Sequence, residues 1–262
     1  MSHPIVSVRD LKVHFPVRGG LLGRVTDHVR AVDGVSFDLM PGRTVAIVGE
    51  SGSGKSTTGY AVMGMQDPTE GQIMIDGRDR AQMSPTEKMA TMRRLQIIFQ
   101  DPASALNPRM TAYDSIVEPL QIHRVGNARE RRARVAELLD LVGLPQSSAG
   151  KLPREFSGGQ KQRVVIARAL VLEPQAVICD EAVSALDVSI QSQILNLLLD
   201  LQARLGLAYV FISHDLSVVR HIADDILVMQ AGKVVEQGQT DAIFQAPRHS
   251  YTRQLLAAVP KL

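Results

Sequence analysis

One glycine-rich segment of the chain has residue types that suit the binding of phosphate groups. Residues 49–56 read Gly-Glu-Ser-Gly-Ser-Gly-Lys-Ser, which fits the G-x-x-x-x-G-K-[ST] pattern of a P-loop. Glycines let the backbone curl so that successive amides point at phosphate oxygens, and the positive end of a following helix adds to the attraction. We expect Lys55 to reach the β- and γ-phosphates and the Ser56 hydroxyl to ligate Mg²⁺. The residues expected to contact the nucleotide here are Gly49, Ser51, Gly52, Ser53, Gly54, Lys55, Ser56 and Thr57.

Two adjacent carboxylates supply a second chemical element. Asp180 and Glu181 follow the apolar run Ala176–Cys179, and ligands of parallel sheets collect at the carboxyl ends of such strands. Asp180 can hold Mg²⁺ through water, and Glu181 can polarise the water that attacks the γ-phosphate. The plain alternative is two acids that end a strand at a turn. The P-loop in the same chain favours the catalytic interpretation.

A second glycine-rich turn lies between these two elements. Residues 157–160, which are Ser157, Gly158, Gly159 and Gln160, open a helical pattern and can also present amides and a hydroxyl to phosphate. One nucleotide does not need two such anion sites from one chain. We therefore expect this turn to serve the nucleotide of a partner subunit, so that two molecules hold two ATPs head to tail.

The elements that must position these residues alternate along the chain. Short unbroken apolar runs are typical of strands buried on both faces of a parallel sheet, and helical patterns lie between them. The predicted strands are 44–48, 95–99, 176–179 and 209–212, and the predicted helices are 55–65, 159–172, 190–205 and 216–222. The alternation predicts an α/β core with right-handed crossovers.

The remaining segments depart from this alternation. Half-exposed antiparallel strands are expected at 5–15 and 29–39, with a loop at 18–24, and the proline-punctuated stretch 101–156 is expected to be a helical insert with a helix at 128–142. Two short helices are expected at 241–245 and 251–259. We interpret Met83, Met89 and Met92 as packing residues, with a pliable partner surface as the alternative. The expected organisation is a β layer with the P-loop part of the core (1–100), a helical subdomain (101–160), the remainder of the core (161–240) and a helical tail (241–262).

Composition excludes several classes of protein. The 262 residues are 45% apolar and 21% charged, which predicts a folded chain with a sizeable core. A net charge of +2 is too small for a general attraction to nucleic acid. The single cysteine, Cys179, allows no internal disulfide and fits a reducing compartment. We find no apolar window long enough to span a membrane and no leader pattern, and we expect a cytosolic location.

These motifs, in this order, resemble the ATP-binding subunits of ABC transporters over essentially the whole chain. The most specific element is Ser157–Gln160, the family signature, between the P-loop and the strand that ends in Asp180 and Glu181. The resemblance implies an α/β fold: a P-loop NTPase (RecA-like) core with a mainly parallel sheet, an N-terminal antiparallel β layer and an inserted helical subdomain.

The resemblance also implies roles for single residues. Gln100 resembles the Q-loop glutamine that senses Mg²⁺ and links to the membrane subunit, and Asp187 resembles the D-loop aspartate that reaches across the dimer. His214 resembles the switch histidine that contacts the γ-phosphate. Phe15 is implied to stack on adenine, although the family often has Tyr there and a core position is the alternative. Many members carry proline at the position of Ala182. Alanine in its place removes only a backbone restraint.

Further stretches resemble the dipeptide, oligopeptide and nickel importer branch of the family. They are 48–56, 99–102, 107–110, 182–189 and the tail 247–253, which resembles a His-Pro-Tyr-Thr-Arg motif with Ser250 in place of proline. The implied protein binds ATP and Mg²⁺ and hydrolyses ATP to energise a peptide importer. Its implied partners are a second ATP-binding subunit, identical or different, two transmembrane permease subunits and, indirectly, an extracytoplasmic substrate-binding protein. The implied location is peripheral, at the cytoplasmic face of the inner membrane.

Three other functions share part of this pattern. A nickel or other small-solute importer of the same branch has the same motifs, because membrane subunits and a binding protein choose the cargo. An ABC-type ATPase acting on DNA or ribosomes shares the catalytic motifs. Such proteins usually carry a long coiled coil or two cassettes, and from these residues we expect neither; the near-neutral charge also argues against a nucleic-acid groove. A P-loop kinase leaves the second glycine turn unexplained.

Overall fold

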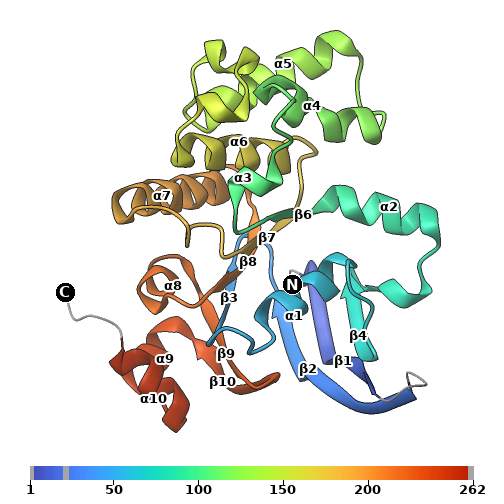
Figure 1. Cartoon of the computed structure of the whole chain (residues 1–262), viewed down its shortest axis with the longest axis vertical. Helices are drawn as coiled ribbons and strands as arrows, with labels where there is room; N and C mark the ends of the chain where they lie inside the picture. The colour runs from blue at the N-terminus through green and yellow to red at the C-terminus, as the bar shows by residue number, and fades with distance from the viewer. Residues whose placement is uncertain (1–2, 20–23, 259–262) are drawn as a thin grey trace. The chain divides into compact units, whose positions relative to one another are not determined.

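The computed structural model describes residues 3–19 and 24–258 and divides into two compact units. The first unit comprises Met1–Lys88 and Ala208–Leu262, and the second comprises Met89–Leu207. Figure 1 traces both along the chain. Each unit contains strands and helices of its own. The predicted P-loop lies in the first unit, and the second glycine-rich turn lies in the second unit.

An antiparallel sheet lies in the first unit. Its strands are ordered β2-β1-β4-β5 and are β1 (Val6–Gly19), β2 (Arg24–Leu39), β4 (Glu70–Ile75) and β5 (Arg78–Asp79). Apolar residues of β1 such as Val6, Val8 and Leu11 are completely buried, as half-buried strands require. The predicted N-terminal antiparallel layer is confirmed, and its blue strands are visible in Figure 1.

The first two strands extend further than the sequence predicts. The pairing of β1 with β2 continues to Arg18↔Val25 and Gly19↔Arg24. The predicted loop is therefore wrong at Arg18, Gly19 and Arg24, while residues 20–23 lie outside the described residues. Backbone groups pair whether or not the side chains are apolar, so hydropathy did not reveal this extension.

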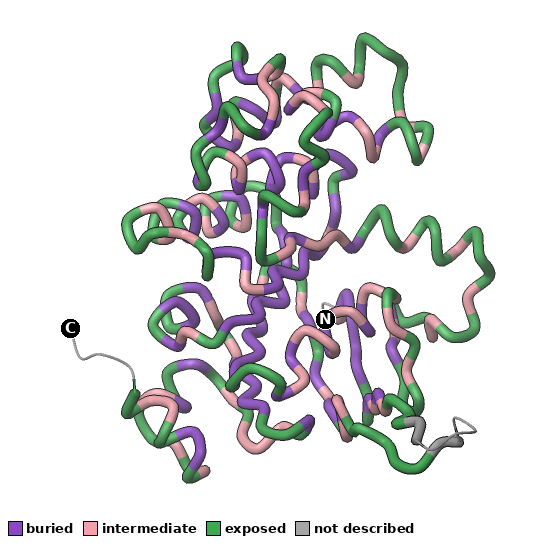
Figure 2. The backbone as a smooth tube through the Cα atoms, viewed as in Figure 1, coloured by how far each residue is buried: buried purple, intermediate pink, exposed green. Residues whose placement is uncertain are grey.

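The first unit also contains four strands ordered β10-β9-β3-β8. β3 (Thr44–Val48) pairs in parallel with both β8 (Ala208–Ser213) and β9 (Asp225–Gln230), and β10 (Lys233–Gln239) pairs antiparallel with β9. Every residue of β3 and β8 is buried, as Figure 2 shows in purple. The predicted strands 44–48 and 209–212 are confirmed.

Helices of the first unit follow these strands. The predicted helix 55–65 is α1, which ends two residues earlier, and 216–222 is α8. The tail forms two short helices, as predicted, although the predicted end of the second at 259 lies outside the described residues. The helical elements are α1 (Lys55–Met63), η1 (Arg80–Gln82), α8 (Leu216–Ile222), α9 (Thr240–Gln245) and α10 (Ser250–Ala257).

The second unit has one parallel strand pair and a helical assembly. β6 (Leu95–Ile98) pairs in parallel with β7 (Ala176–Asp180). The other elements are α3 (Pro102–Ala105), α4 (Ala112–Ile122), α5 (Ala128–Leu141), η2 (Gln146–Gly150), η3 (Pro153–Glu155), α6 (Gly158–Leu170) and α7 (Val188–Leu205). Helix α6 packs against α3, α4, α5 and α7. The expected helical insert is present, with its predicted helix 128–142 as α5.

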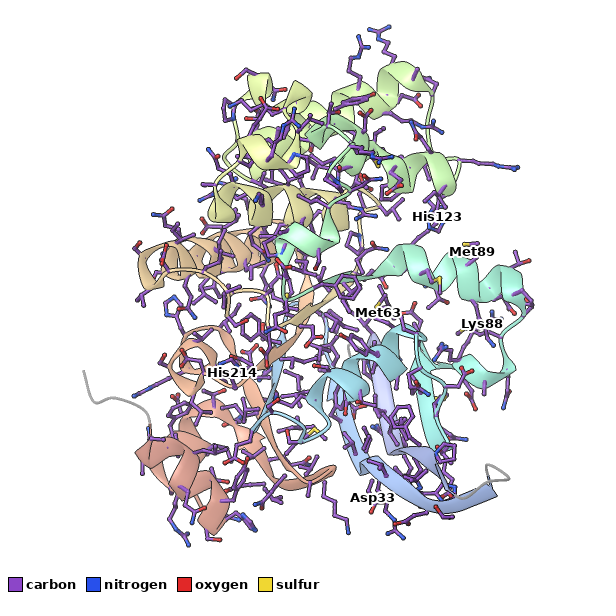
Figure 3. The ribbon with its side chains drawn as sticks, viewed as in Figure 1. Asp33, Met63, Lys88, Met89, His123 and His214 are labelled. Carbon is purple, nitrogen blue, oxygen red and sulfur yellow. The ribbon has the colours of Figure 1, made fainter. Side chains whose placement is uncertain are left out.

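One helix, α2 (Pro85–Arg94), contradicts the interpretation of the methionines. None of its residues is buried, and Met89 and Met92 are 53% and 42% exposed. Figure 3 labels Met89 on this helix. The packing interpretation is therefore wrong for these two side chains. Within residues 3–19 and 24–258, no helix has the length and apolar character needed to cross a membrane.

Candidate nucleotide-binding and catalytic site

The predicted P-loop joins β3 to α1 in the first unit. Its backbone makes close approaches that leave no room for a side chain at two positions. Gly49 has φ 151°, and a Cβ there would lie 2.2 Å from the carbonyl oxygen of Met229. Gly54 has φ 102°, and a Cβ there would lie 2.1 Å from the carbonyl oxygen of Ala31. Glycine is required at both positions, because these conformations are rare for other residues and the contacts are with backbone.

Two polar side chains of this loop, Lys55 and Ser53, are buried. Lys55 is buried, and its Nζ donates hydrogen bonds of 2.8 Å to the carbonyl oxygens of Gly49 and Glu50. The hydroxyl of Ser53 is buried and has no hydrogen-bond partner among the described residues. A buried hydroxyl without a partner is costly, and a phosphate oxygen would satisfy it. Ser56 and Thr57 are half-buried in the first turn of α1, the positive end of its dipole.

The candidate switch histidine lies close to the P-loop in the sheet. β8 runs parallel to β3 with Val48 paired to Ser213, so the P-loop and His214 both leave the carboxyl ends of adjacent strands. His214 is exposed, and Figure 3 labels it after β8. The Asp215 side chain accepts a hydrogen bond from the Ser217 amide and caps α8.

The candidate adenine-stacking residue is not part of the core. Phe15 is 39% exposed on β1 and pairs with Val29, which is 56% exposed on β2. The core alternative is therefore excluded, and an aromatic ring at the surface remains available to a ligand.

The two carboxylates, Asp180 and Glu181, and the candidate Q-loop glutamine, Gln100, all lie in the second unit. Ile98 of β6 pairs with Cys179 of β7, so Gln100 and Glu181 follow adjacent strand ends. Gln100 Nε2 donates a hydrogen bond of 2.9 Å to Glu181 Oε2. Asp180 is buried at the end of β7, and Glu181 has φ 48°, an uncommon left-handed conformation for a residue with a side chain.

Ser184 was not assigned a role from the sequence. Its hydroxyl donates a hydrogen bond of 2.9 Å to the Glu181 carbonyl oxygen and accepts one of 3.4 Å from Gln100 Nε2. The signal in the sequence is the three-residue spacing from Glu181, which is the reach of a single turn. Ser184 thus helps to fix the turn that carries Glu181.

The signature motif is also a helix cap. Ser157 Oγ accepts a hydrogen bond from the Gln160 amide at 3.3 Å, and Gln160 Oε1 accepts one from the Ser157 amide at 3.0 Å. This reciprocal pair is the capping box of α6, which the S-x-x-Q spacing allows. A Cβ at Gly159 would lie 2.6 Å from Ile190 Cγ2. The signature and α7, whose N-cap is Asp187, are thus tightly packed within this unit.

Two further features limit the chemistry of the site. Burial, with a smaller contribution from the Asp180 charge, raises the pKa of the Cys179 thiol well above its usual range, so it is not a nucleophile. No group of three or more His, Cys, Asp or Glu side chains suited to a metal occurs in the described part of the chain.

The predicted site residues therefore fall into two sets. The first unit holds Phe15, Gly49, Ser51, Gly52, Ser53, Gly54, Lys55, Ser56, Thr57 and His214. The second unit holds Gln100, Ser157, Gly158, Gly159, Gln160, Asp180, Glu181 and Asp187. Each set contains the turn from one of the two glycine-rich motifs.

Solved structures share this fold. The cbiO1 protein from Clostridium perfringens, described as part of the ABC transporter complex cbiONQ, is 29% identical, with a TM-score of 0.81 over 93% of this chain and 92% of that one. The ATP-binding cassette MJ0796, in a dimeric post-hydrolysis state bound to ADP and Pi, is 30% identical, with a TM-score of 0.78 over 90% of this chain and 98% of that one. The fold is that of a P-loop NTPase.

Sequence relatives agree with the solved structures. Glutathione import ATP-binding protein GsiA from Escherichia coli strain K12 is 54% identical over 259 residues, as is GsiA from Shigella flexneri. The match covers 99% of this chain and 42% of each relative, so the chain spans less than half the length of these relatives. The family model described as "ABC transporter" matches residues 32–184. With its motifs, its fold and these relatives in agreement, the chain belongs to the ABC transporter family.

Proposed function

We propose that this chain is an ATP-binding and ATP-hydrolysing subunit that energises an importer of di- or oligopeptides. The observation that carries the proposal is the 54% identity across 99% of the chain to a glutathione import ATP-binding protein. Glutathione is a small peptide, and the tail motif and the 99–102 segment favour the same importer branch. The near-neutral charge fits a motor that binds phosphate only locally.

The P-loop is the proposed ATP-binding element. Its amides and the Lys55 ammonium bind the phosphates, and the unpartnered Ser53 hydroxyl supports this role. Lys55 exchanges its two carbonyl acceptors for phosphate oxygens when nucleotide enters. Phe15, exposed on β1, stacks on the adenine ring.

Mg²⁺ fits the donors that the chain offers. The Ser56 hydroxyl, the Asp180 carboxylate and the Gln100 amide oxygen are all hard oxygen ligands, with Asp180 acting through water. When bound, the ion neutralises charge on the β- and γ-phosphates. The chain itself supplies the buried Asp180 carboxylate and the Ser56 hydroxyl that would hold the ion.

Glu181 is the proposed general base for ATP hydrolysis. It accepts a proton from the attacking water, and His214 contacts the γ-phosphate from the end of β8. The hydrogen bond from Gln100 orients the Glu181 carboxylate, and the Ser184 hydroxyl stabilises the turn that carries it. These groups act together on a phosphoryl transfer that is mainly a matter of position and charge.

The functional assembly is proposed to be a pair of ATP-binding subunits. Ser157–Gln160 of one chain contacts the nucleotide that the P-loop of the other chain binds, and Asp187 reaches across the pair. The dimeric state of the MJ0796 cassette supports this proposal. The pair drives two permease subunits at the cytoplasmic face of the membrane, and a substrate-binding protein delivers the peptide to them.

Membrane purification and transport together test this function. The tagged chain should co-purify with two permease subunits, and vesicles containing the complex should take up labelled glutathione or a dipeptide only with ATP. The Glu181→Gln variant serves as the matched control, because it should assemble but not transport. Salt-sensitive DNA binding without membrane partners would contradict the proposal, and uptake of nickel in place of peptides would contradict the cargo.

A further inference from the structure

The tail motif at residues 247–253 has no role in the chemistry proposed above. The segment leads into α10, and Tyr251 and Thr252 at its start are buried although they lie near the end of the chain. Its position in the first unit is close to the P-loop. This motif therefore requires a physical explanation of its own.

The explanation begins with one hydrogen bond between distant parts of the sequence. The backbone amide of Glu50, in the P-loop, donates to the hydroxyl oxygen of Tyr251 at 3.0 Å. Tyr251 is only 5% exposed, so water competes poorly for this contact. The tail thus contacts the phosphate-binding loop directly.

Glu50 is the point at which the loop is held on both sides. Its carbonyl oxygen accepts hydrogen bonds from Lys55 Nζ at 2.8 Å and from the Ser53 amide at 3.2 Å. With Tyr251 on its amide, both backbone polar groups of Glu50 are satisfied. The contact orients the peptide plane that precedes the phosphate-binding amides.

The tail is itself built to hold the tyrosine in place. The Glu236 carboxylate accepts hydrogen bonds from the amides of Arg248 at 2.7 Å and His249 at 3.0 Å. His249 Nδ1 accepts one from the Tyr251 amide at 3.2 Å and caps α10. Arg253 Nη1 donates to two carbonyl oxygens of the same turn, those of Pro247 and Arg248. These local hydrogen bonds hold the backbone around Tyr251 and thereby position its hydroxyl group.

We propose that Tyr251 is a positioning residue for nucleotide binding, and that the tail motif serves to hold the P-loop in its binding conformation. The inference rests on the proposed function, because it requires that the P-loop binds ATP. Without the hydroxyl, the Glu50 amide loses its protein partner and the entrance of the loop is less restrained. In that case, ATP binding has to reduce the conformational freedom of the P-loop, which the tail reduces before binding in the wild type.

The substitution Tyr251→Phe tests this role by removing one oxygen atom. The Kd for a fluorescent ADP analogue and the KM for ATP should each rise about 2- to 10-fold, the range expected for one hydrogen bond. The kcat at saturating ATP should stay within about twofold, because the tyrosine touches no reacting atom. Tyr113→Phe, which removes a hydroxyl from α4 in the second unit, should leave the Kd and KM unchanged.

Hydrogen exchange gives a readout that does not depend on nucleotide. In the nucleotide-free wild type the Glu50 amide should exchange slowly, and Tyr251→Phe should accelerate its exchange while leaving the amides of α4 unaffected. A Tyr251→Phe variant with wild-type Kd, KM and exchange would overturn the inference alone. If the wild type bound no ADP, the proposed function would be overturned as well. If Tyr113→Phe changed the Kd as much as Tyr251→Phe does, the effect would be a general structural one, and the positioning role would be overturned.

Discussion

Gln100 Nε2 lies 2.9 Å from Glu181 Oε2 and donates a hydrogen bond to it. The two residues are 81 positions apart in the sequence, yet they follow paired strands of the same unit. The proposed base is therefore oriented by a neutral amide that does not compete for its proton. A glutamine at position 181 would keep a side-chain oxygen that can accept this hydrogen bond. The substitution Glu181→Gln is therefore especially informative.

The Glu181→Gln variant should bind ATP with wild-type affinity but hydrolyse it about 10² to 10⁴ times more slowly. The remaining amide oxygen can still accept from Gln100, so the turn keeps its geometry while the base is lost. Single-turnover hydrolysis and nucleotide titration measure the two effects separately. Wild-type turnover in this variant would remove Glu181 from its proposed role.

The Lys55→Ala variant should lose detectable binding of ATP and ADP, because it removes the buried ammonium that is proposed to bind the phosphates. Its fold should persist, since the Glu50 carbonyl oxygen keeps its hydrogen bond from the Ser53 amide. Nucleotide titration and thermal melting check the two expectations. Lys88→Ala removes the same charge from an exposed position on α2 and should bind normally; Lys88 is labelled in Figure 3.

The Gly159→Ala variant should be destabilised by about 1 to 3 kcal/mol, the usual cost of overpacking. Its new methyl group would lie 2.6 Å from Ile190 Cγ2, and a β-branched side chain has little freedom to move away. Urea unfolding measures the change. Adding Ile190→Ala to Gly159→Ala removes the obstructing methyl, so the double variant should lose less stability than the sum of the two single variants. Simple additivity would show that this contact does not restrict position 159.

Acidification should weaken the attachment of the tail through Glu236. Burial acts to raise the pKa of this carboxyl, but the hydrogen bonds from the amides of Arg248 and His249 oppose it, and the pKa lies below its usual value of 4.5. A carboxyl whose pKa is lower in the folded state than in the unfolded state stabilises the fold at pH values above its unfolded-state pKa. This contribution is lost as the pH falls through the folded-state pKa.

Urea unfolding from neutral to acidic pH measures this effect. The Glu236→Gln variant should show a smaller loss of stability on acidification than the wild type does. Equal slopes for the two proteins would contradict the role assigned to the carboxylate.

The thiol of Cys179 should not react with thiol reagents in the folded protein. It is completely buried, and its raised pKa leaves almost no thiolate at neutral pH. A colourimetric thiol assay should report one thiol in urea and none in buffer. Rapid labelling of the native protein would show that β7 opens readily.

The sequence predicted the parts of the fold in which pattern and burial coincide. The bounds of β3 were predicted without error, because the apolar residues 45–48 end at Gly49 and the strand begins shortly after Gly42, which favours a short buried strand. Gln100 was assigned by resemblance, and the structure adds its hydrogen bond to Glu181. Local patterns therefore identified the strands that lead into the candidate site residues.

Other features could not be predicted, for physical reasons. Helix α2 buries no residue, so it has no apolar periodicity, and its methionines were misinterpreted. The contact of Tyr251 with Glu50 joins residues 201 positions apart through a backbone amide, which leaves no trace in side-chain spacing. The spacing of Ser157 and Gln160 fits a capping box, but Ser157 was interpreted only as a phosphate-binding residue.

The central claim is that the two glycine-rich turns act on one nucleotide only when they come from different chains. Two forms of the Glu181→Gln protein test it, one carrying Ser51→Cys and the other Ser157→Cys, treated with a short bismaleimide; Cys179 is expected to be silent. The mixture should give a covalent pair with ATP, and neither form alone should do so. An ATP-dependent crosslink inside a single chain that carries both cysteines at high dilution, with no pair in the mixture, would contradict the claim.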